Sequence, residues 1–109
     1  MIDVQYYLTT SGRNVVDAWL TGLQDERTAA KIAVRIERLA LGNFGDCKPV
    51  ADGVWELRID WGPGYRVYYA MAGKSVVLLL CGGDKRKQTA DINRAIGNWN
   101  DYQRRTGKR

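Results

Sequence analysis

The chain has 109 residues, 45% of them hydrophobic and 27% charged, which is the composition of one ordinary globular domain and excludes disorder over the whole length. A formal net charge of +5 favours a polyanion or an acidic protein as partner. Histidine is absent, so Ser-His-Asp and Cys-His catalytic sites are excluded, and any acid-base chemistry must use Lys, Tyr, Asp or Glu.

The two cysteines, Cys47 and Cys81, do not have the spacing of metal ligands. No segment has the pattern of a secretory signal or of a membrane-spanning helix. We therefore expect a cytoplasmic protein with both thiols reduced, with no bound metal and no cofactor.

The N-terminal part of the chain predicts a strand followed by a helical hairpin. Residues 2–8 alternate apolar and polar side chains, as a strand does. Apolar residues at helical spacing predict helices over residues 12–22, with Ser11 as N-cap, and over residues 25–41, which Gly42 ends. Basic side chains form one stripe on the polar side of the second helix: Lys31, Arg35 and Arg38. Such a stripe is usually a solvated face; the alternative is a contact with nucleic acid or phosphate.

Residues 54–60 and 65–71 predict two strands joined by a Gly-Pro-Gly turn. Centring the hairpin on Gly62 makes one face wholly apolar and places Arg58 opposite Arg66 on the other face. That second face also carries Glu56 and Tyr68. Like charges in such a pair repel each other, so an anion is expected between the arginines, unless Glu56 neutralises one of them in solvent.

The remaining elements follow in chain order. Residues 43–53 are expected to be irregular, and residues 75–82, a continuous apolar run, predict a strand buried on both faces. Apolar spacing predicts a helix over residues 88–104, and residues 104–109 are expected to form a frayed basic tail.

These elements have the order β-α-α-β-β-β-α, which indicates an α+β single domain of residues 1–109. We expect two helices to cover one face of an antiparallel-meander sheet and to leave the other partly open. Antiparallel pairing brings Arg66 to the end of the strand 75–82, where Lys85 and Lys87 follow, and Arg58 joins them as the partner of Arg66.

The segments WELRIDWGPGYRVYY and LLLCGGDKRKQTADINRA resemble the phage-derived HigB-type toxins, also called addiction module killer proteins, of the RelE/ParE superfamily. The resemblance covers nearly the whole chain and implies a RelE-like fold. It also implies a type II toxin, a metal-independent endoribonuclease that cuts mRNA on the ribosome and arrests translation. A helix-turn-helix, HigA-like antitoxin would neutralise it. The alternatives are a ParE-like inhibitor of DNA gyrase on the same fold, without nuclease activity, and a basic binding module without toxicity.

The resemblance also implies which residues act on the scissile phosphate. Gly64-Tyr65-Arg66 matches the Gly-Tyr-Arg segment of the family, so Arg66 is expected there, and the basic strand position falls on Arg58. The basic stretch after the last strand falls on Lys85 and Arg86, with Lys87 adjacent.

The chemistry assigns these residues expected roles. The guanidinium forks of Arg58 and Arg66 match phosphate oxygens and suit a developing negative charge. Neighbouring arginines disfavour the charged form of a lysine, so Lys85 or Lys87 is the expected proton carrier, with Tyr68 as a second candidate on the same face. Further side chains are expected to contact RNA phosphates or bases: Arg86, Lys31, Arg35, Arg38, Arg94, Tyr68 and Trp61.

Overall fold

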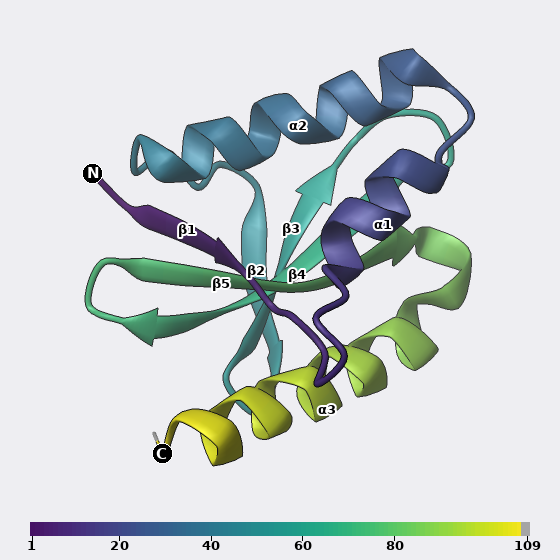
Figure 1. Cartoon of the computed structure of the whole chain (residues 1–109). Helices are drawn as coiled ribbons and strands as arrows, with labels where there is room; N and C mark the ends of the chain where they lie inside the picture. Colours follow the sequence, from purple (N-terminus) through teal and green to yellow (C-terminus); the bar gives the residue numbers. More distant parts are fainter. Residues whose placement is uncertain (108–109) are drawn as a thin grey trace.

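The computed structural model describes residues 1–107, which form a five-stranded sheet with helices on both faces (Figure 1). The strands are β1 (Asp3–Tyr6), β2 (Cys47–Ala51), β3 (Val54–Ile59), β4 (Tyr65–Gly73) and β5 (Val76–Asp84). The helices are α1 (Val15–Gly22), α2 (Glu26–Ala40) and α3 (Gln88–Thr106), and a short 3-10 turn, η1 (Lys85–Lys87), joins β5 to α3. The expected α+β class and the helical hairpin are confirmed.

Polar side chains cap the first two helices. Asp25 accepts a hydrogen bond from the backbone N–H of Arg27 and caps α2. The cap of α1 is Asn14, whose side chain accepts from the N–H of Asp17, and not the expected Ser11. Ser11 lies within hydrogen-bond distance of Thr9 instead, inside a loop that precedes the helix, so α1 starts three residues later than its apolar pattern suggests.

The strands are ordered β1-β5-β4-β3-β2, which places β4 at the centre of the sheet. All pairs are antiparallel except β1 and β5, which run parallel, so the sheet is not purely the antiparallel meander that was expected. The segment 43–53, expected to be irregular, contains β2. This strand pairs with β3 and shifts register after Pro49, and as an edge strand it tolerates a proline, which has no N–H to donate.

The register of the hairpin β3–β4 agrees with the expected centre at Gly62. Trp55 lies opposite Tyr69, and Arg58 lies opposite Arg66. The next pair, between β4 and β5, sets Arg66 opposite Gly83. The end of β5 and the turn η1 therefore lie beside Arg66, with Arg58 on the next strand.

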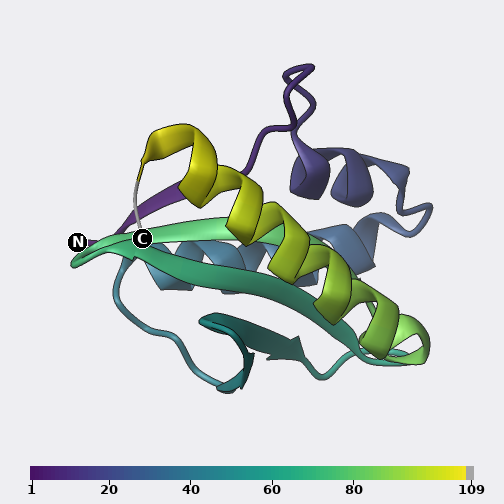
Figure 2. The same ribbon diagram turned by 90° about the horizontal axis from the view of Figure 1, so that it is seen from below.

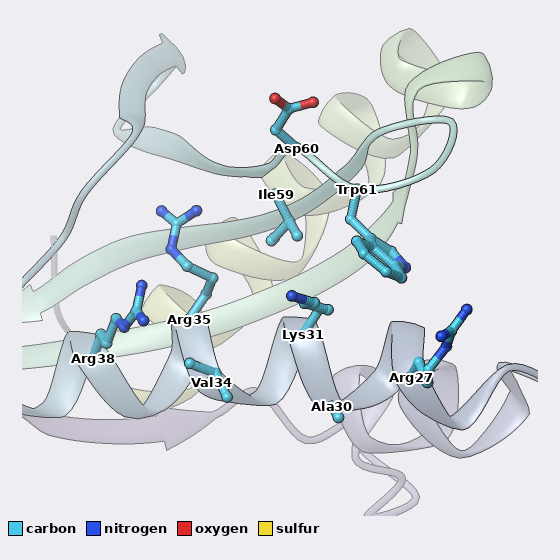
Figure 3. A pocket seen from close by; sticks show the side chains of 9 residues that line it. All are labelled: Arg27, Ala30, Lys31, Val34, Arg35, Arg38, Ile59, Asp60 and Trp61. Atoms are coloured by element: carbon cyan, nitrogen blue, oxygen red, sulfur yellow. The ribbon is translucent and has the colours of Figure 1, made fainter.

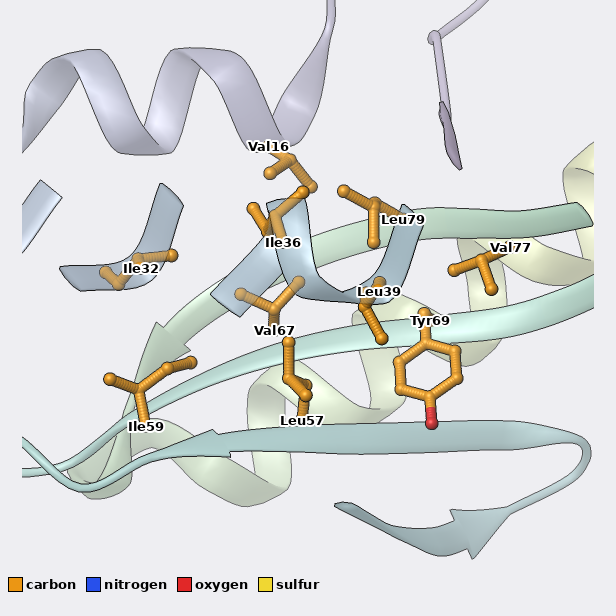
Figure 4. Packing of buried hydrophobic residues seen from close by; sticks show 10 residues of the cluster. All are labelled: Val16, Ile32, Ile36, Leu39, Leu57, Ile59, Val67, Tyr69, Val77 and Leu79. Atoms are coloured by element: carbon orange, nitrogen blue, oxygen red, sulfur yellow. The ribbon is translucent and has the colours of Figure 1, made fainter. Parts of the chain in front are cut away.

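Helices cover both faces of the sheet, so the expectation that one face would be left partly open is wrong. Figure 2 shows α3 across one side of the sheet and α2 on the opposite side. The face under α1 and α2 packs the first cluster, drawn in Figure 4: Val16, Ile32, Ile36, Leu39, Leu57, Ile59, Val67, Tyr69, Val77 and Leu79. The face under α3 packs a second cluster: Tyr7, Val54, Tyr68, Ala70, Ala72, Leu78, Leu80, Cys81 and Ala95.

Helix α3 continues past the point where a frayed tail was expected. Asp101 binds both Arg104 and Arg105, and the helix runs to Thr106, so the basic residues after position 103 are partly helical. The last two residues of the expected tail, 108–109, lie outside the described residues. Within residues 1–107, none of the helices is long and apolar enough to cross a membrane.

Candidate functional site

The end of the hairpin β3–β4 and the start of η1 border an open groove of about 350 Å³, here called the hairpin groove. Arg58, Arg66 and Lys85 all line it, so the structure brings together three of the residues expected at the phosphate. The backbone N–H of Lys85 donates to the carbonyl of Gly64 at 3.0 Å, which fastens the turn η1 to the hairpin.

Arg58 is held by a carboxylate that the sequence did not indicate. Its Nε and Nη2 donate to Oδ1 of Asp46 at 3.1 and 2.7 Å. The hydrogen bond from Arg58 holds the pKa of Asp46 below its usual value, and a smaller effect of desolvation opposes it. Asp46 lies one residue before β2, and its carbonyl also accepts from the Arg58 N–H at 2.9 Å. Its position depends on the pairing of β2 with β3, which local patterns did not reveal.

Arg66 is more enclosed than Arg58, with 13% of its side chain exposed against 36%. Its Nε lies 3.6 Å from Oε1 of Glu56, which is fully buried, and its Nη1 donates weakly to the Tyr65 carbonyl at 3.4 Å. The arginine therefore reaches the hairpin groove from the interior of the protein, on the face that α3 covers.

Tyr68 lies in the same interior, next to this pair, and not at the surface. It is fully buried, and within residues 1–107 its hydroxyl has no hydrogen-bond partner. Burial raises the pKa of Tyr68 well above its usual value, so the hydroxyl stays protonated. In this position Tyr68 has no surface to offer RNA, and it does not reach the groove as a proton carrier.

The turn η1 separates its basic side chains. Arg86 pairs with Asp84 at 2.8 Å, and this hydrogen bond lowers the pKa of Asp84. Lys87 does not line the hairpin groove; it lines a neighbouring groove of about 400 Å³, together with Arg86 and Arg94. Arg94 pairs there with the buried carboxylate of Asp91.

The basic stripe of α2 lines a third groove of about 560 Å³, here called the helix groove (Figure 3). Lys31, Arg35 and Arg38 take part, and Arg27, one helical turn before Lys31, extends the stripe. The i,i+4 spacing could have indicated Arg27. Ile59 and Asp60 line both this groove and the hairpin groove, so the two adjoin at the end of β3.

Trp61, which was expected to contact RNA, lies across the helix groove and is half-buried. Its Nε1 donates to Oγ1 of Thr28 at 3.1 Å, and the Lys31 ammonium lies 4.8 Å from the ring centroid. Figure 3 shows Lys31 and Arg27 on the side of the ring that faces α2. The indole joins the hairpin tip to α2, so one of its faces is not free for a base.

Arg35 has a mainly structural position within the stripe. Its guanidinium donates to the carbonyl of Arg58 at 2.5 Å and to that of Phe44 at 3.2 Å. These bonds satisfy backbone acceptors at the end of β3 and in the loop before β2, and they tie α2 to the hairpin groove. Lys31 and Arg38 are exposed and remain accessible to a ligand.

Within residues 1–107, no three His, Cys, Asp or Glu side chains gather closely enough to hold a metal ion. A model of the family of phage-derived Gp49-like proteins (DUF891) matches residues 18–96 of the chain. A protein of Haemophilus influenzae that carries the name "Uncharacterized protein" is 56% identical over 79 residues, which cover 72% of this chain and 80% of that protein. The family is associated with the toxins of toxin-antitoxin systems. The matched residues include the whole hairpin groove.

Proposed function

We propose that this chain, which belongs to the family of phage-derived Gp49-like proteins, is the toxin of a toxin-antitoxin pair and acts as an endoribonuclease that cuts mRNA on the ribosome. One observation carries the proposal: Arg58, Arg66 and Lys85, from two strands and a turn, converge on one open groove. The resemblance of the hairpin and of the segment after β5 to HigB-type toxins supports the same reading.

Three cations around one groove suit a phosphodiester that gains negative charge during cleavage. The 2′-oxygen attacks the phosphorus, and the pentacoordinate transition state carries more charge on its oxygens than the substrate does. The planar forks of Arg58 and Arg66 match two such oxygens each. Because Arg66 is mostly enclosed, its attraction for this charge is less screened by water than that of a surface arginine.

The reaction also needs a group that takes the 2′-hydroxyl proton and one that protonates the departing 5′-oxygen. We assign proton transfer to Lys85, which lines the hairpin groove next to both arginines. The carboxylate of Asp46 lies nearby, but a carboxylate whose pKa is held low by Arg58 is a poor base. Lys87 lines the neighbouring groove, which suits a contact with the RNA backbone better than a part in proton transfer.

The helix groove continues the hairpin groove past Asp60 and offers exposed cations at Arg27, Lys31 and Arg38. An RNA strand with one phosphate between Arg58 and Arg66 can extend along this stripe. Arg27 and Lys31 are four residues apart, a rise of about 6 Å along a helix axis, which is close to the spacing of successive phosphates.

The proposed partners are mRNA, the ribosome and an antitoxin, which the resemblance implies to be a HigA-like helix-turn-helix protein. A gyrase inhibitor on the same fold would not need cations arranged around one phosphate. An experiment can distinguish the two functions. Primer extension on cellular mRNA after induction of the protein distinguishes cutting of mRNA from arrest of DNA replication.

The decisive variants are Arg66→Ala and Arg66→Lys, because the lysine keeps the charge and loses the fork. Arg104→Ala is the matched control, since Arg104 is 72% exposed at the other end of α3. We expect discrete cuts within translated codons for the wild type and the control, and a loss of about 10²- to 10³-fold in cleavage for both Arg66 variants. Intact mRNA together with arrested DNA replication would overturn the proposal.

A further inference from the structure

Glu56 is a fully buried carboxylate in the middle of β3, on the face covered by α3. Acidic side chains are rarely buried to this degree unless cations or hydrogen-bond donors surround them. Four side chains from different elements face this one, at distances of 3.1 Å for Gln88 Nε2, 3.6 Å for Arg66 Nε, 3.9 Å for Lys48 Nζ and 4.0 Å for Arg58 Nε.

The contacts of Glu56 differ in kind. The amide of Gln88 donates a hydrogen bond to Oε1, whereas the three cations stand beyond hydrogen-bond distance and act by charge attraction. Within residues 1–107, Oε2 of Glu56 and Nε of Arg66 have no hydrogen-bond partner. The negative charge is therefore shared among several cations and is not neutralised by one of them.

This arrangement explains how two arginines can lie opposite each other on neighbouring strands. Arg58 and Arg66 are paired residues of β3 and β4, where like charges repel. Glu56 lies two residues before Arg58 on the same face of β3, within 4.0 Å of both guanidinium groups. Its charge lies between the two guanidiniums and offsets their repulsion, while Asp46 holds Arg58 from the other side by hydrogen bonds of 2.7 and 3.1 Å.

Glu56 also reaches the lysine-containing turn. Gln88 is the first residue of α3 and directly follows η1, so its bond to Glu56 fixes the end of that turn. The bond from the Lys85 N–H to the Gly64 carbonyl fixes the beginning. Glu56 thus connects the cations of the hairpin groove: it contacts Arg58 and Arg66 directly, and it reaches the turn that carries Lys85 through Gln88.

Stability alone does not account for a carboxylate at this position. Removing a charged group from water is unfavourable, and an apolar side chain of similar size is often as good or better in a protein interior. Two of the three cations that Glu56 contacts, Arg58 and Arg66, line the hairpin groove, and the third, Lys48, lies on the edge strand β2. A role in positioning the cations of that groove would account for the unfavourable burial of the carboxylate.

We propose that Glu56 is the positioning residue of the hairpin groove, which holds Arg58 and Arg66 side by side for a phosphate and, through Gln88, keeps the turn with Lys85 in register with them. The inference rests on the proposed function for the identity of the phosphate as part of an RNA chain. Glu56 itself is fully buried and does not touch the substrate.

The charge of Glu56 gives the inference a distinctive signature. Glu56→Gln keeps the size of the side chain and an acceptor for Gln88, and removes one negative charge from beneath the groove. The groove becomes more positive, so RNA binding stays the same or tightens, while the guanidiniums lose their alignment. Misplacement of catalytic groups by about 1 Å lowers turnover by up to about 100-fold.

The experiment compares wild type, Glu56→Gln, Glu56→Asp and the control Asp101→Asn, which removes a carboxylate that binds two arginines at the other end of α3. Single-turnover cleavage of ribosome-bound mRNA gives the rate, and binding of the same mRNA with a 2′-deoxy residue at the cut site gives Kd. We expect Glu56→Gln to cut about 10- to 100-fold more slowly with an unchanged or lower Kd, Glu56→Asp to recover part of the rate, and the control to match the wild type.

A second readout does not depend on RNA cleavage. The Nε–H NMR signals of Arg58 and Arg66 should move in Glu56→Gln and stay in place in Asp101→Asn. If the wild type cuts no RNA but these signals move, the proposed function fails and the positioning role stands. Unmoved signals, or a full rate per folded molecule in Glu56→Gln, would overturn the inference. Should Glu56→Gln not fold, Gln88→Ala breaks the amide link alone and must slow cleavage without weakening binding.

Discussion

The two faces of the sheet are both covered by helices, but they bury different kinds of side chain. Under α1 and α2, the buried strand residues are apolar or aromatic, such as Leu57 and Val67. Under α3, the interior also contains Glu56, Tyr68 and Asp91, each with a polar atom that has no hydrogen-bond partner in residues 1–107. Buried polar atoms without a partner are costly, and among residues 1–107 they are confined to this face, whereas the buried Thr28 on α2 is hydrogen-bonded. We infer that the face under α3 serves the groove at its edge and that the other face serves stability.

The largest expected effect comes from the apolar face. Leu57 is fully buried and is the chain neighbour of Glu56, so the two form a matched pair on opposite faces of β3. Leu57→Ala should lower the free energy of unfolding by about 2–5 kcal/mol, because it leaves a cavity in a packed core. Urea denaturation measures this loss. Cleavage per folded molecule should be unchanged, and a specific loss of activity would show that the two faces do not divide their roles.

The next largest effect is expected for substitutions in β5, which packs against helices on both faces. A methyl group at Gly82 would collide with the indole of Trp19 in α1, and one at Gly83 with the carboxylate of Asp91 in α3. Both alanine substitutions should destabilise the protein by about 1–3 kcal/mol through overpacking. Only Gly83→Ala should also slow RNA cleavage, since it displaces the first turns of α3. Equal activity of the two variants at equal stability would contradict this distinction.

A smaller effect is expected from the unpaired hydroxyl under α3. Tyr68→Phe removes a buried polar group without a partner, so the free energy of unfolding should stay the same or rise by up to about 1 kcal/mol. Cleavage should be retained, because the hydroxyl does not reach the hairpin groove. A loss of activity in a stable Tyr68→Phe protein would restore the hydroxyl as a proton carrier.

The same residue predicts how stability depends on alkaline pH. Burial raises the pKa of both Tyr68 and Tyr69, so above the unfolded value of about 10 the folded state binds more protons than the unfolded state. Stability is therefore fully present below about pH 10 and is lost as the pH rises further. Urea midpoints between neutral pH and pH 11 should fall less steeply for Tyr68→Phe than for the wild type.

The smallest effect concerns the two thiols, one packed against each cluster. Cys47 is half-buried beside the first cluster, whereas Cys81 is fully buried in the second, where burial raises its pKa to about 11. A thiol reagent at neutral pH should modify Cys47 first and Cys81 only after unfolding. Mass spectrometry of the modified peptides measures the order, and rapid labelling of Cys81 would show that α3 opens readily.

The sequence predicted those parts of the fold that local patterns control. The glycines of the hairpin turn and the alternation on either side of Gly62 set the register that places Arg58 opposite Arg66. Helical spacing located all three helices to within a few residues. The continuous apolar run before Gly82 indicated a strand buried on both faces, and this was already a sign that α3 covers the second face.

The parts that were missed depend on contacts between distant segments. Strand β2 contains a proline and an exposed lysine, and it forms by pairing with the edge of β3. Its pairing places Asp46 against Arg58, and no local pattern indicates that partner. Trp61 stands at the hairpin tip, but its indole packs against α2, where it contacts Thr28 and Lys31. Glutamate is usually a surface residue, so the burial of Glu56 was not anticipated.

The ion pair between Arg58 and Asp46 has a consequence for which anions the groove admits. Because Asp46 belongs to the same chain, it stands beside Arg58 at an effective concentration on the order of millimolar or higher, and a free monovalent or divalent anion competes with it poorly. In a polymer that already has one phosphate near Arg66 and others along α2, the next phosphate is also held at a high effective concentration. Such a phosphate can compete with the Asp46 carboxylate for Arg58. We therefore expect the hairpin groove to bind free small anions weakly and to bind a polymer that carries several phosphates.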